Sequence, residues 1–291
     1  MTAQTVLNKP ADPVDFKNAQ REQWDRSAQG WDTHSQIIND WLRQATDAML
    51  DLASVRAGSS VLDVAAGSGG QTLEAAKRAG EQGRVLATDL SPAILALAQS
   101  NARQAGFKNV QTLVADGEDI LVEPASFDAA ICRLGLMLFP NPLQGLRSMH
   151  RALRPGGAIC TVVFSRPERN PCLGILMSTA LKHAGQPVRD PFQPGGLMSL
   201  GKPGLIDELF NKAGFQHTTT TSLDAPFRLP TARHYLEFVR SSASPIQQIL
   251  GRLSVPEQNA AWAEMEERLE MFNTPDGWIG PNELLLTAAK R

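Results

Sequence analysis

Residues 60–70 read Ser-Val-Leu-Asp-Val-Ala-Ala-Gly-Ser-Gly-Gly, and this stretch decides the fold class. Its first half, Ser60 to Val64, is a short β-branched, apolar run, which predicts a buried strand. Its second half is a glycine turn, and a helix is expected over residues 72–79. Glycines let a backbone turn tightly and approach a ligand closely. The stretch therefore predicts a strand, a ligand-contacting turn and a helix.

The same order of strand and helix continues along the chain. Helices are expected after Ser91-Pro92, where Ser suits the N-cap and Pro the first helical position, and over about 143–153. This alternation predicts a doubly wound α/β fold, with a mostly parallel sheet covered by helices on both faces. Such sheets bind ligands at the carboxyl ends of their strands. The seven strands are expected at 60–64, 84–88, 110–115, 127–132, 158–164, 215–223 and 283–289.

The alternation breaks after Ser165, and two insertions of mainly helical pattern follow. We expect them to form a helical cap rather than decoration, because both follow strands whose carboxyl ends should face the site. Residues up to about 18 are polar, and their start is expected to be disordered. The predicted organisation is an N-terminal helical lid over 1–52, core segments over 53–165, 202–225 and 276–291, and cap insertions over 166–201 and 226–275.

Composition excludes several functional classes. The net charge of -2 and the lack of a Lys/Arg run argue against a nucleic-acid partner. Three cysteines without a CxxC pair argue against a disulfide framework and a zinc knuckle, and fit a cytoplasmic protein. The longest apolar run, residues 129–139, is interrupted by Arg133 and is too short to span a bilayer. Monomer and homodimer both remain open.

The glycine turn separates two cofactor classes. A dinucleotide fingerprint needs a third glycine where this chain has Thr72, so that pattern fails. Instead, acids stand at three successive strand ends: Asp63, Asp89 and Asp116. A carboxylate at the second strand end can accept hydrogen bonds from both ribose hydroxyls of an adenosine. Each acid alone could cap a helix or a turn, but together with the glycines they favour an adenosine-containing ligand.

Several segments resemble the motifs of class I S-adenosylmethionine-dependent methyltransferases, and the resemblance covers most of residues 24–164. It is similar in particular to the small-molecule group that includes the ubiquinone/menaquinone-pathway enzymes. Ala65 departs from that family's usual first glycine and leaves slightly less room there. The matching segments are 61–69, 87–92, 115–118, 127–137 and 151–157, with 28–32 resembling an N-terminal lid.

The resemblance implies a Rossmann-like methyltransferase sheet and S-adenosyl-L-methionine as cofactor. It implies that Asp89 holds the ribose and that Arg133 faces the methionine carboxylate or the substrate. The remaining cofactor residues implied are Trp31 in the lid, Asp63, Ala65, Gly67, Ser68 and Gly69 around the methionine moiety, and Leu90, Asp116, Gly117 and Glu118 around the adenine.

Methyl transfer from a sulfonium needs in-line alignment and exclusion of water, so we expect neither a catalytic triad nor a metal. An Asn/Asp-Pro-Pro-Tyr turn is absent after residues 127–132, which argues against a DNA target. A small-molecule acceptor is favoured, with O- or C-methylation preferred and N-methylation open. A non-catalytic cofactor-binding protein and an RNA or protein methyltransferase remain the alternatives; a nucleotide-binding oxidoreductase is disfavoured.

The acceptor site leaves a weaker signal in the sequence. His34 in the lid and His234 in the cap are candidate general bases. For each candidate, core packing or solvent exposure is an equally ordinary explanation. The residues expected around the acceptor are Met137, His183, Tyr235 and Phe238, together with Trp24 and Trp31.

Overall fold

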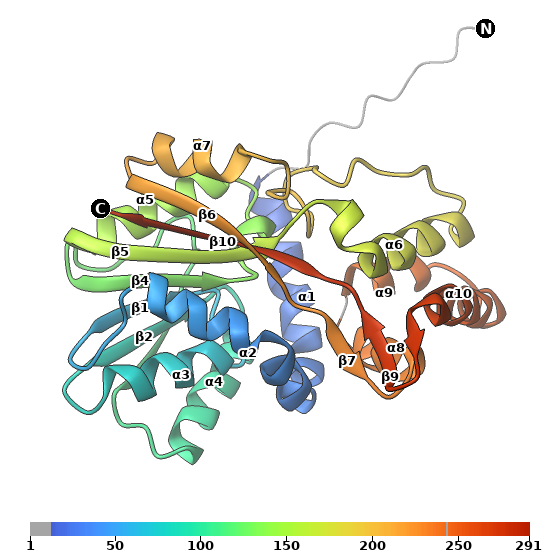
Figure 1. Ribbon diagram of the computed structural model, residues 1–291, viewed down its shortest axis with the longest axis horizontal. Coiled ribbons are helices and arrows are strands. Elements are labelled where there is room, and N and C mark those ends of the chain that lie inside the picture. The colour runs from blue at the N-terminus through green and yellow to red at the C-terminus, as the bar shows by residue number, and fades with distance from the viewer. Residues whose placement is uncertain (1–12, 243) are drawn as a thin grey trace, which may run out of the picture.

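The computed structural model describes residues 13–242 and 244–291, and its largest unit is a seven-stranded sheet of order β3-β2-β1-β4-β5-β10-β6 (Figure 1). Strands β1 to β5 pair in parallel, while β10 runs antiparallel to both β5 and β6. This confirms the predicted doubly wound α/β fold. The strands are β1 Ser60–Val64, β2 Arg84–Asp89, β3 Val110–Val114, β4 Phe127–Arg133, β5 Leu153–Phe164, β6 Gln216–Asp224 and β10 Glu283–Lys290.

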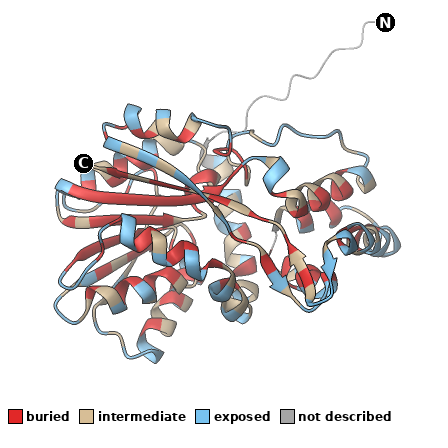
Figure 2. Cartoon of the chain, in the orientation of Figure 1, coloured by how far each residue is buried: buried red, intermediate tan, exposed pale blue. Residues whose placement is uncertain are grey.

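Helices cover both faces of the sheet, and the central strands β1, β4 and β5 are buried along most of their length, whereas the edge strands β3 and β6 are not (Figure 2). Helices α2 (Ser35–Leu52), α3 (Gly70–Ala79) and α4 (Pro92–Gln104) form one layer, and α5 (Pro142–Ala152) and α7 (Leu205–Lys212) form another. The predicted start of α4 is confirmed, because the Ser91 hydroxyl accepts a hydrogen bond from the Ile94 N–H at 3.1 Å.

The N-terminal segment forms two helices where the sequence predicted one. Helix α1 (Pro13–Thr33) ends just before His34, and α2 begins at Ser35. Leu42, Ala45 and Met49 form the buried stripe that packs α2 on the sheet, so α2 belongs to the core layer. Helix α1 lies between the core and the cap in Figure 1. The predicted disorder of residues 1–12 lies outside the described residues, whereas residues 13–18 are helical.

The insertions form a separate unit beside the sheet (right in Figure 1), made of α6 (Pro171–His183), α8 (Ala232–Ser242), α9 (Ser244–Leu250) and α10 (Val255–Leu269). It also contains a three-stranded antiparallel sheet that the helical reading of 226–275 did not predict. Its strands are two to four residues long, too short to leave a period-two pattern. They are β7 Phe227–Leu229, β8 Asn273–Thr274 and β9 Gly277–Gly280; the 3₁₀ turns are Leu136–Leu138, Pro167–Arg169 and Glu270–Phe272.

Trp278 is the centre of the cap core. Its side chain is 0% exposed, its ring stacks on Tyr235 at 4.9 Å, and its indole N–H donates to the Leu269 carbonyl at 2.8 Å. The cap therefore has an apolar core of its own, distinct from the helix layers that cover the seven-stranded sheet.

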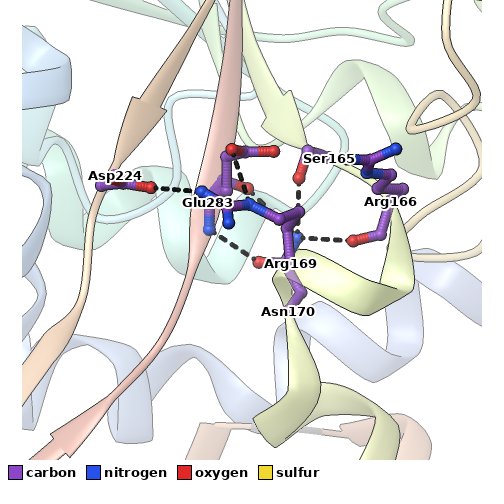
Figure 3. Close-up of polar contacts among 6 residues, drawn as sticks. All are labelled: Ser165, Arg166, Arg169, Asn170, Asp224 and Glu283. Atoms are coloured by element: carbon purple, nitrogen blue, oxygen red, sulfur yellow. Dashed lines mark hydrogen bonds and ion pairs between the residues drawn. The ribbon is translucent and has the colours of Figure 1, made fainter.

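A buried asparagine ties the cap to the core where β5, β6 and β10 cross from one to the other (Figure 3). The Asn170 amide nitrogen donates to the Ser165 hydroxyl at 3.1 Å and to the Glu283 carbonyl at 3.2 Å, and its oxygen accepts from the Glu283 N–H at 3.1 Å. Arg169 then bridges the Glu283 and Asp224 carboxylates at 2.9 and 3.2 Å. These contacts hold the three segments that connect the core to the cap, at the ends of β5, β6 and β10, in fixed positions relative to one another.

The structure also bears on membrane spans and on the cysteines. In residues 13–242 and 244–291, no helix combines the length and the apolarity needed to cross a membrane. Cys132, Cys160 and Cys172 are free and buried. Burial raises the pKa of the Cys132 and Cys160 thiols to about 12, so both stay protonated and unreactive near neutral pH.

Candidate functional site

A pocket opens at the carboxyl ends of β1 to β4, beside the point where the strand order reverses between β1 and β4. This is the position at which open α/β sheets bind ligands. Its volume, counted with the solvent at its mouth, is about 1110 Å³. The sheet supplies its floor, and residues 16–42 of α1 and α2 supply its cover.

The glycine turn after β1 forms part of the floor through Gly67 and Ser68. Ala65, in place of the expected glycine, has φ +57°, and Leu134 at the end of β4 has φ +58°. Left-handed conformations in non-glycine residues are held only by the structure around them and gather at functional sites. Here they lie on the two strands that flank the switch point. A Cβ on Gly135 would lie 2.4 Å from the Ala65 Cβ, so glycine is needed for this close approach.

Asp89 lines the pocket next to this turn, with Leu90 beside it. Its Oδ2 accepts a hydrogen bond from the Gly67 N–H at 2.9 Å, and its Oδ1 accepts from the Ser91 N–H at 3.0 Å. Burial raises the pKa of Asp89, and these backbone hydrogen bonds oppose the rise. A carboxylate oxygen has more than one lone pair, so both oxygens keep capacity to accept from a diol.

Asp63 does not line the pocket, although it was expected around the methionine moiety. It is 0% exposed beneath the turn, where its carboxylate accepts hydrogen bonds from the Thr72 hydroxyl at 2.6 Å and the Gln71 amide at 3.2 Å. Burial raises the pKa of Asp63 to about 7, against these hydrogen bonds and the nearby charge of Arg133. Asp63 therefore supports the start of α3 from below. Gly69 likewise stands outside the lining, as the left-handed N-cap of α3.

Asp63→Asn is expected to be more stabilising, relative to wild type, as pH rises. A carboxyl with a raised pKa in the folded state contributes stability that is full below its unfolded pKa of 3.8 and lost as pH rises through about 7. The amide carries no charge, keeps one oxygen that can accept from the Gln71 amide, and presents its NH2 group to the Thr72 hydroxyl, which can accept. The free energy of unfolding, measured in urea, would be compared between Asp63→Asn and wild type at each pH. The variant's value minus the wild-type value should rise by at least about 1 kcal/mol between pH 4 and pH 8. A constant difference would contradict the raised pKa.

The opposite end of the pocket is formed by Asp116, Gly117 and Glu118 after β3. The Lys17 ammonium from α1 lies 2.6 Å from the Asp116 Oδ2 and 2.6 Å from the Glu118 Oε2. Burial lowers the pKa of Lys17, but the hydrogen bonds and charges of both acids outweigh it and the net shift is upward. A Cβ on Gly117 would lie 2.2 Å from the Phe139 ring, so this glycine lets the ring pack on the backbone.

Lys17→Met should weaken binding of a nucleoside ligand by about two- to fivefold, since partly exposed ion pairs contribute about 0.2–1 kcal/mol. The loss should also remove part of the salt dependence of binding, which exposed pairs carry. Titration at low and high ionic strength would measure both effects. Lys17→Arg, which retains the charge, is the matched control and should bind like wild type. Equal salt dependence in Lys17→Met and wild type would contradict a closing role for this ion pair.

Arg133 lies at the exit of β4 and lines the pocket. Its Nη1 donates to the Thr46 hydroxyl at 2.7 Å, and no carboxylate of the described residues lies within 4.0 Å of it. Burial lowers the pKa of Arg133 to about 10, while the charge of Asp63 opposes that shift. The guanidinium therefore stays charged near neutral pH and lacks an anionic partner in this part of the structure.

Helix α1 is fastened over the pocket at two further points. The Ser91 hydroxyl donates to the Asp25 carboxylate at 2.5 Å, and the Asn101 amide donates to Asp32 at 2.9 Å. Asn101 also donates to the Ser68 carbonyl at 3.0 Å, which links α1 to the glycine turn. Trp31, the expected lid aromatic, lines the pocket and donates its indole N–H to the Ser242 carbonyl at 3.2 Å. The lid thus contacts the core and the cap.

The candidate bases do not border the pocket. His234 is exposed and shares a hydrogen bond with the Thr231 hydroxyl at 2.8 Å. The His34 Nδ1 lies 2.9 Å from the Gly30 carbonyl and 3.2 Å from the Ser241 hydroxyl, between lid and cap. Neither ring is placed to exchange a proton with a molecule in the pocket.

The expected acceptor residues are also outside the lining. His183 contacts Glu264 at 2.9 Å on the cap, and Tyr235 belongs to the cap core. Phe238 packs behind Trp31, with ring centroids 6.1 Å apart. Met137 is buried, and its carbonyl accepts from the Ser199 hydroxyl at 2.5 Å. No described residue beyond 165 lines the pocket, and α1 lies between the core and the cap in Figure 1.

Several residues that line the pocket were not predicted from the sequence. Lys17 and Phe16 fall in the polar segment up to residue 18, and a helix without a strong apolar face gives little periodic signal that shows which residues face a ligand. Asn39 was placed in a helix, but nothing in its spacing showed which way it faces. Phe139 follows β4 and could have been found as a large aromatic at a strand exit. Trp24, which was expected around the acceptor, also lines this pocket.

Comparison with known proteins gives a family and a fold. Residues 26–179, more than half of the chain, match the ubiE/COQ5 methyltransferase family. The ubiquinone/menaquinone biosynthesis C-methyltransferase UbiE of Idiomarina loihiensis is 34% identical over 119 residues, which are 40% of this chain and 47% of that protein. UbiE of Klebsiella pneumoniae is 33% identical over 123 residues, 42% of this chain and 49% of that protein. The chain thus spans about half the length of the curated relatives it matches.

Solved structures with low sequence identity share the fold. The YcgJ protein of Bacillus subtilis aligns with a TM-score of 0.58 at 17% identity, over 86% of this chain and 98% of that one. The [4+2]-cyclase SpnF aligns with a TM-score of 0.55 at 20% identity, over 92% and 96%. Phosphoethanolamine N-methyltransferase 2 of Haemonchus contortus aligns with a TM-score of 0.58 at 17% identity, over 97% and 61%. With its glycine turn, strand-end acids and switch-point pocket, the chain belongs to the ubiE/COQ5 methyltransferase family.

Proposed function

We propose that this protein transfers the methyl group of S-adenosylmethionine to a small-molecule acceptor. One observation carries the proposal: a single pocket at the switch point joins a carboxylate with open acceptor capacity, Asp89, to a charged guanidinium without an anionic partner, Arg133. A ribose diol and an amino-acid carboxylate are the complementary groups, and S-adenosylmethionine carries both. The family membership supports the same cofactor.

The residues of the pocket divide among the parts of that cofactor. Asp89 would accept hydrogen bonds from the ribose hydroxyls, and Leu90 would pack on the adenine. Asp116 would orient the adenine edge, with Lys17 closing over it. Ala65, Gly67 and Ser68 would line the methionine chain, and Arg133 its carboxylate. Asp63 and Gly69 would act indirectly, by fixing the turn and the start of α3.

The bound cofactor supplies an already activated methyl group, so the protein must align the acceptor and keep water out. Trp24 and Trp31 from the lid, and Leu138 and Phe139 after β4, provide the apolar walls for this. The lining residues in the described ranges include no His or Tyr. The acceptor would therefore bring a nucleophile that needs no proton transfer to such a side chain.

Carbon or oxygen is the favoured acceptor atom, and the matched relatives are C-methyltransferases by name. Nitrogen stays open, since a fold neighbour is an N-methyltransferase. Another neighbour is a [4+2]-cyclase, so the fold alone does not fix methyl transfer. The runner-up function is a cofactor-binding protein without turnover, or a methyltransferase acting on RNA or protein.

The test uses S-adenosylmethionine with a tritiated methyl group. A cell extract is first separated by filtration into a small-molecule filtrate and a retained fraction of protein and RNA, and the filtrate is kept under reducing conditions. The full chain is then incubated with each fraction. We expect label in an organic-extractable small molecule from the filtrate. Label in the retained fraction alone would favour the RNA or protein alternative. Binding without label in either fraction would favour the non-catalytic one. Arg133→Met and Asp89→Ala are the negative controls.

A further inference from the structure

We propose that Thr46 is a positioning residue whose hydroxyl aims the Arg133 guanidinium at a carboxylate in the pocket. This inference rests on the proposed cofactor, and it concerns a residue on α2 that does not itself line the pocket. It predicts that the chain selects adenosine ligands with an amino-acid carboxylate over those without one.

The hydrogen bonds of Thr46 fix its hydroxyl as an acceptor toward Arg133. Thr46 is 3% exposed, and its Oγ1 donates to the Leu42 carbonyl at 2.8 Å, one turn earlier in α2. A hydroxyl has one hydrogen and two acceptor lone pairs, so its hydrogen is used within the helix. The lone pairs face the Arg133 Nη1, which donates at 2.7 Å. The helix backbone therefore sets the direction in which the hydroxyl holds the guanidinium.

The rest of the guanidinium is left for a ligand. A guanidinium has five N–H donors in one plane, and Thr46 takes one. No described carboxylate lies within ion-pair distance, and Asp63 acts on Arg133 only through its charge. Gly70 lets the chain pass close to the guanidinium, since a Cβ there would lie 3.1 Å from the Arg133 Nη2 and 2.4 Å from the Asn39 Oδ1. A planar donor fork of this kind matches a carboxylate in two-pronged geometry.

Without the Thr46 hydroxyl, the part-buried guanidinium would lose its one hydrogen bond to the described residues, and with it its fixed direction. Because hydrogen bonds to charged groups are strong, a misaligned guanidinium should bind a carboxylate ligand about tenfold more weakly. A ligand lacking the carboxylate makes no contact with the fork, so its affinity should not change. This difference separates a positioning role from a general structural one.

The experiment compares two ligands by calorimetry on five chains: wild type, Thr46→Val, Thr46→Ser, Arg133→Met and the Arg133→Met/Thr46→Val double variant. S-adenosylhomocysteine carries the carboxylate, and 5′-methylthioadenosine lacks it. We expect Thr46→Val to bind S-adenosylhomocysteine about tenfold more weakly than wild type and 5′-methylthioadenosine equally well. Thr46→Ser, which keeps the hydroxyl, should restore wild-type binding. In an Arg133→Met background, Thr46→Val should have no further effect on either ligand. Thr46→Cys, with its weak thiol acceptor, replaces Thr46→Val if that variant does not fold.

Different results would contradict the role of Thr46 and the proposed function. Equal weakening of both ligands in Thr46→Val, or no change in either, would overturn the role of Thr46 while leaving the cofactor assignment in place. An additional effect in the Arg133→Met background would overturn it as well. Failure of the wild-type chain to bind either ligand would overturn the proposed function, and this inference with it.

Discussion

Asp89→Ala should weaken binding of S-adenosylmethionine by roughly 10- to 150-fold, which corresponds to about 1.5–3 kcal/mol for lost hydrogen bonds to a charged group. The substitution removes the acceptor of two ribose hydroxyls. It also releases the Gly67 and Ser91 N–H groups that the carboxylate holds at 2.9 and 3.0 Å. Both losses follow from the removal of one carboxylate, which joins the turn after β1 to the start of α4, so the effect should exceed that of any other single acid in the pocket.

Asp89→Asn is the matched variant, because one amide oxygen can still accept while the charge is removed. Its affinity should fall between those of wild type and Asp89→Ala. Calorimetric titration would be paired with urea unfolding, so that binding is compared only among folded samples. Wild-type affinity in a folded Asp89→Ala protein would refute the ribose role.

Trp278→Ala should lower the free energy of unfolding by about 3–5 kcal/mol, the usual cost of removing a large buried aromatic side chain. Trp278 is fully buried in the cap, stacked on Tyr235 and hydrogen-bonded to the Leu269 carbonyl. The affinity for S-adenosylmethionine should nevertheless stay within about twofold, because distant sites without shared partners act independently. Described cap residues do not line the pocket.

Denaturant unfolding and calorimetry on the same samples would measure both quantities. Met271→Ala, at a residue that is 73% exposed on the same cap, is the control and should change stability by less than about 0.5 kcal/mol. A large loss of affinity in folded Trp278→Ala would contradict the assignment of the pocket cover to α1 and α2, and would return the cap to the binding site.

The core of the fold could be predicted from sequence because its signals are local. Buried parallel strands leave short β-branched runs, and turns leave glycine and proline at fixed places. Strand β1 matches its predicted bounds, and Ser91-Pro92 opens α4 as expected. Strand ends also gather at one edge of a parallel sheet, so the sequence alone places Asp89, Asp116 and Arg133 near one another, and all three line the pocket.

The cover of the pocket could not be predicted in this way, because it depends on tertiary packing. The break at His34 separates α1 from α2 without a proline or glycine at that position. Lys17 meets Asp116 across 99 residues of sequence, and no local pattern marks such a pair. Tyr235 and Phe238 were expected at the acceptor, but an apolar residue on a cap helix serves equally well in a core, and the structure places both there.

The most direct test of the central claim is calorimetric binding of S-adenosylmethionine and S-adenosylhomocysteine to the full chain, with NAD as the control ligand. We predict binding of both sulfur ligands at micromolar affinity and none of NAD, since the turn after β1 has Thr72 where a dinucleotide site needs glycine. A folded sample that binds neither sulfur ligand, or that binds NAD instead, would contradict the assignment of this pocket.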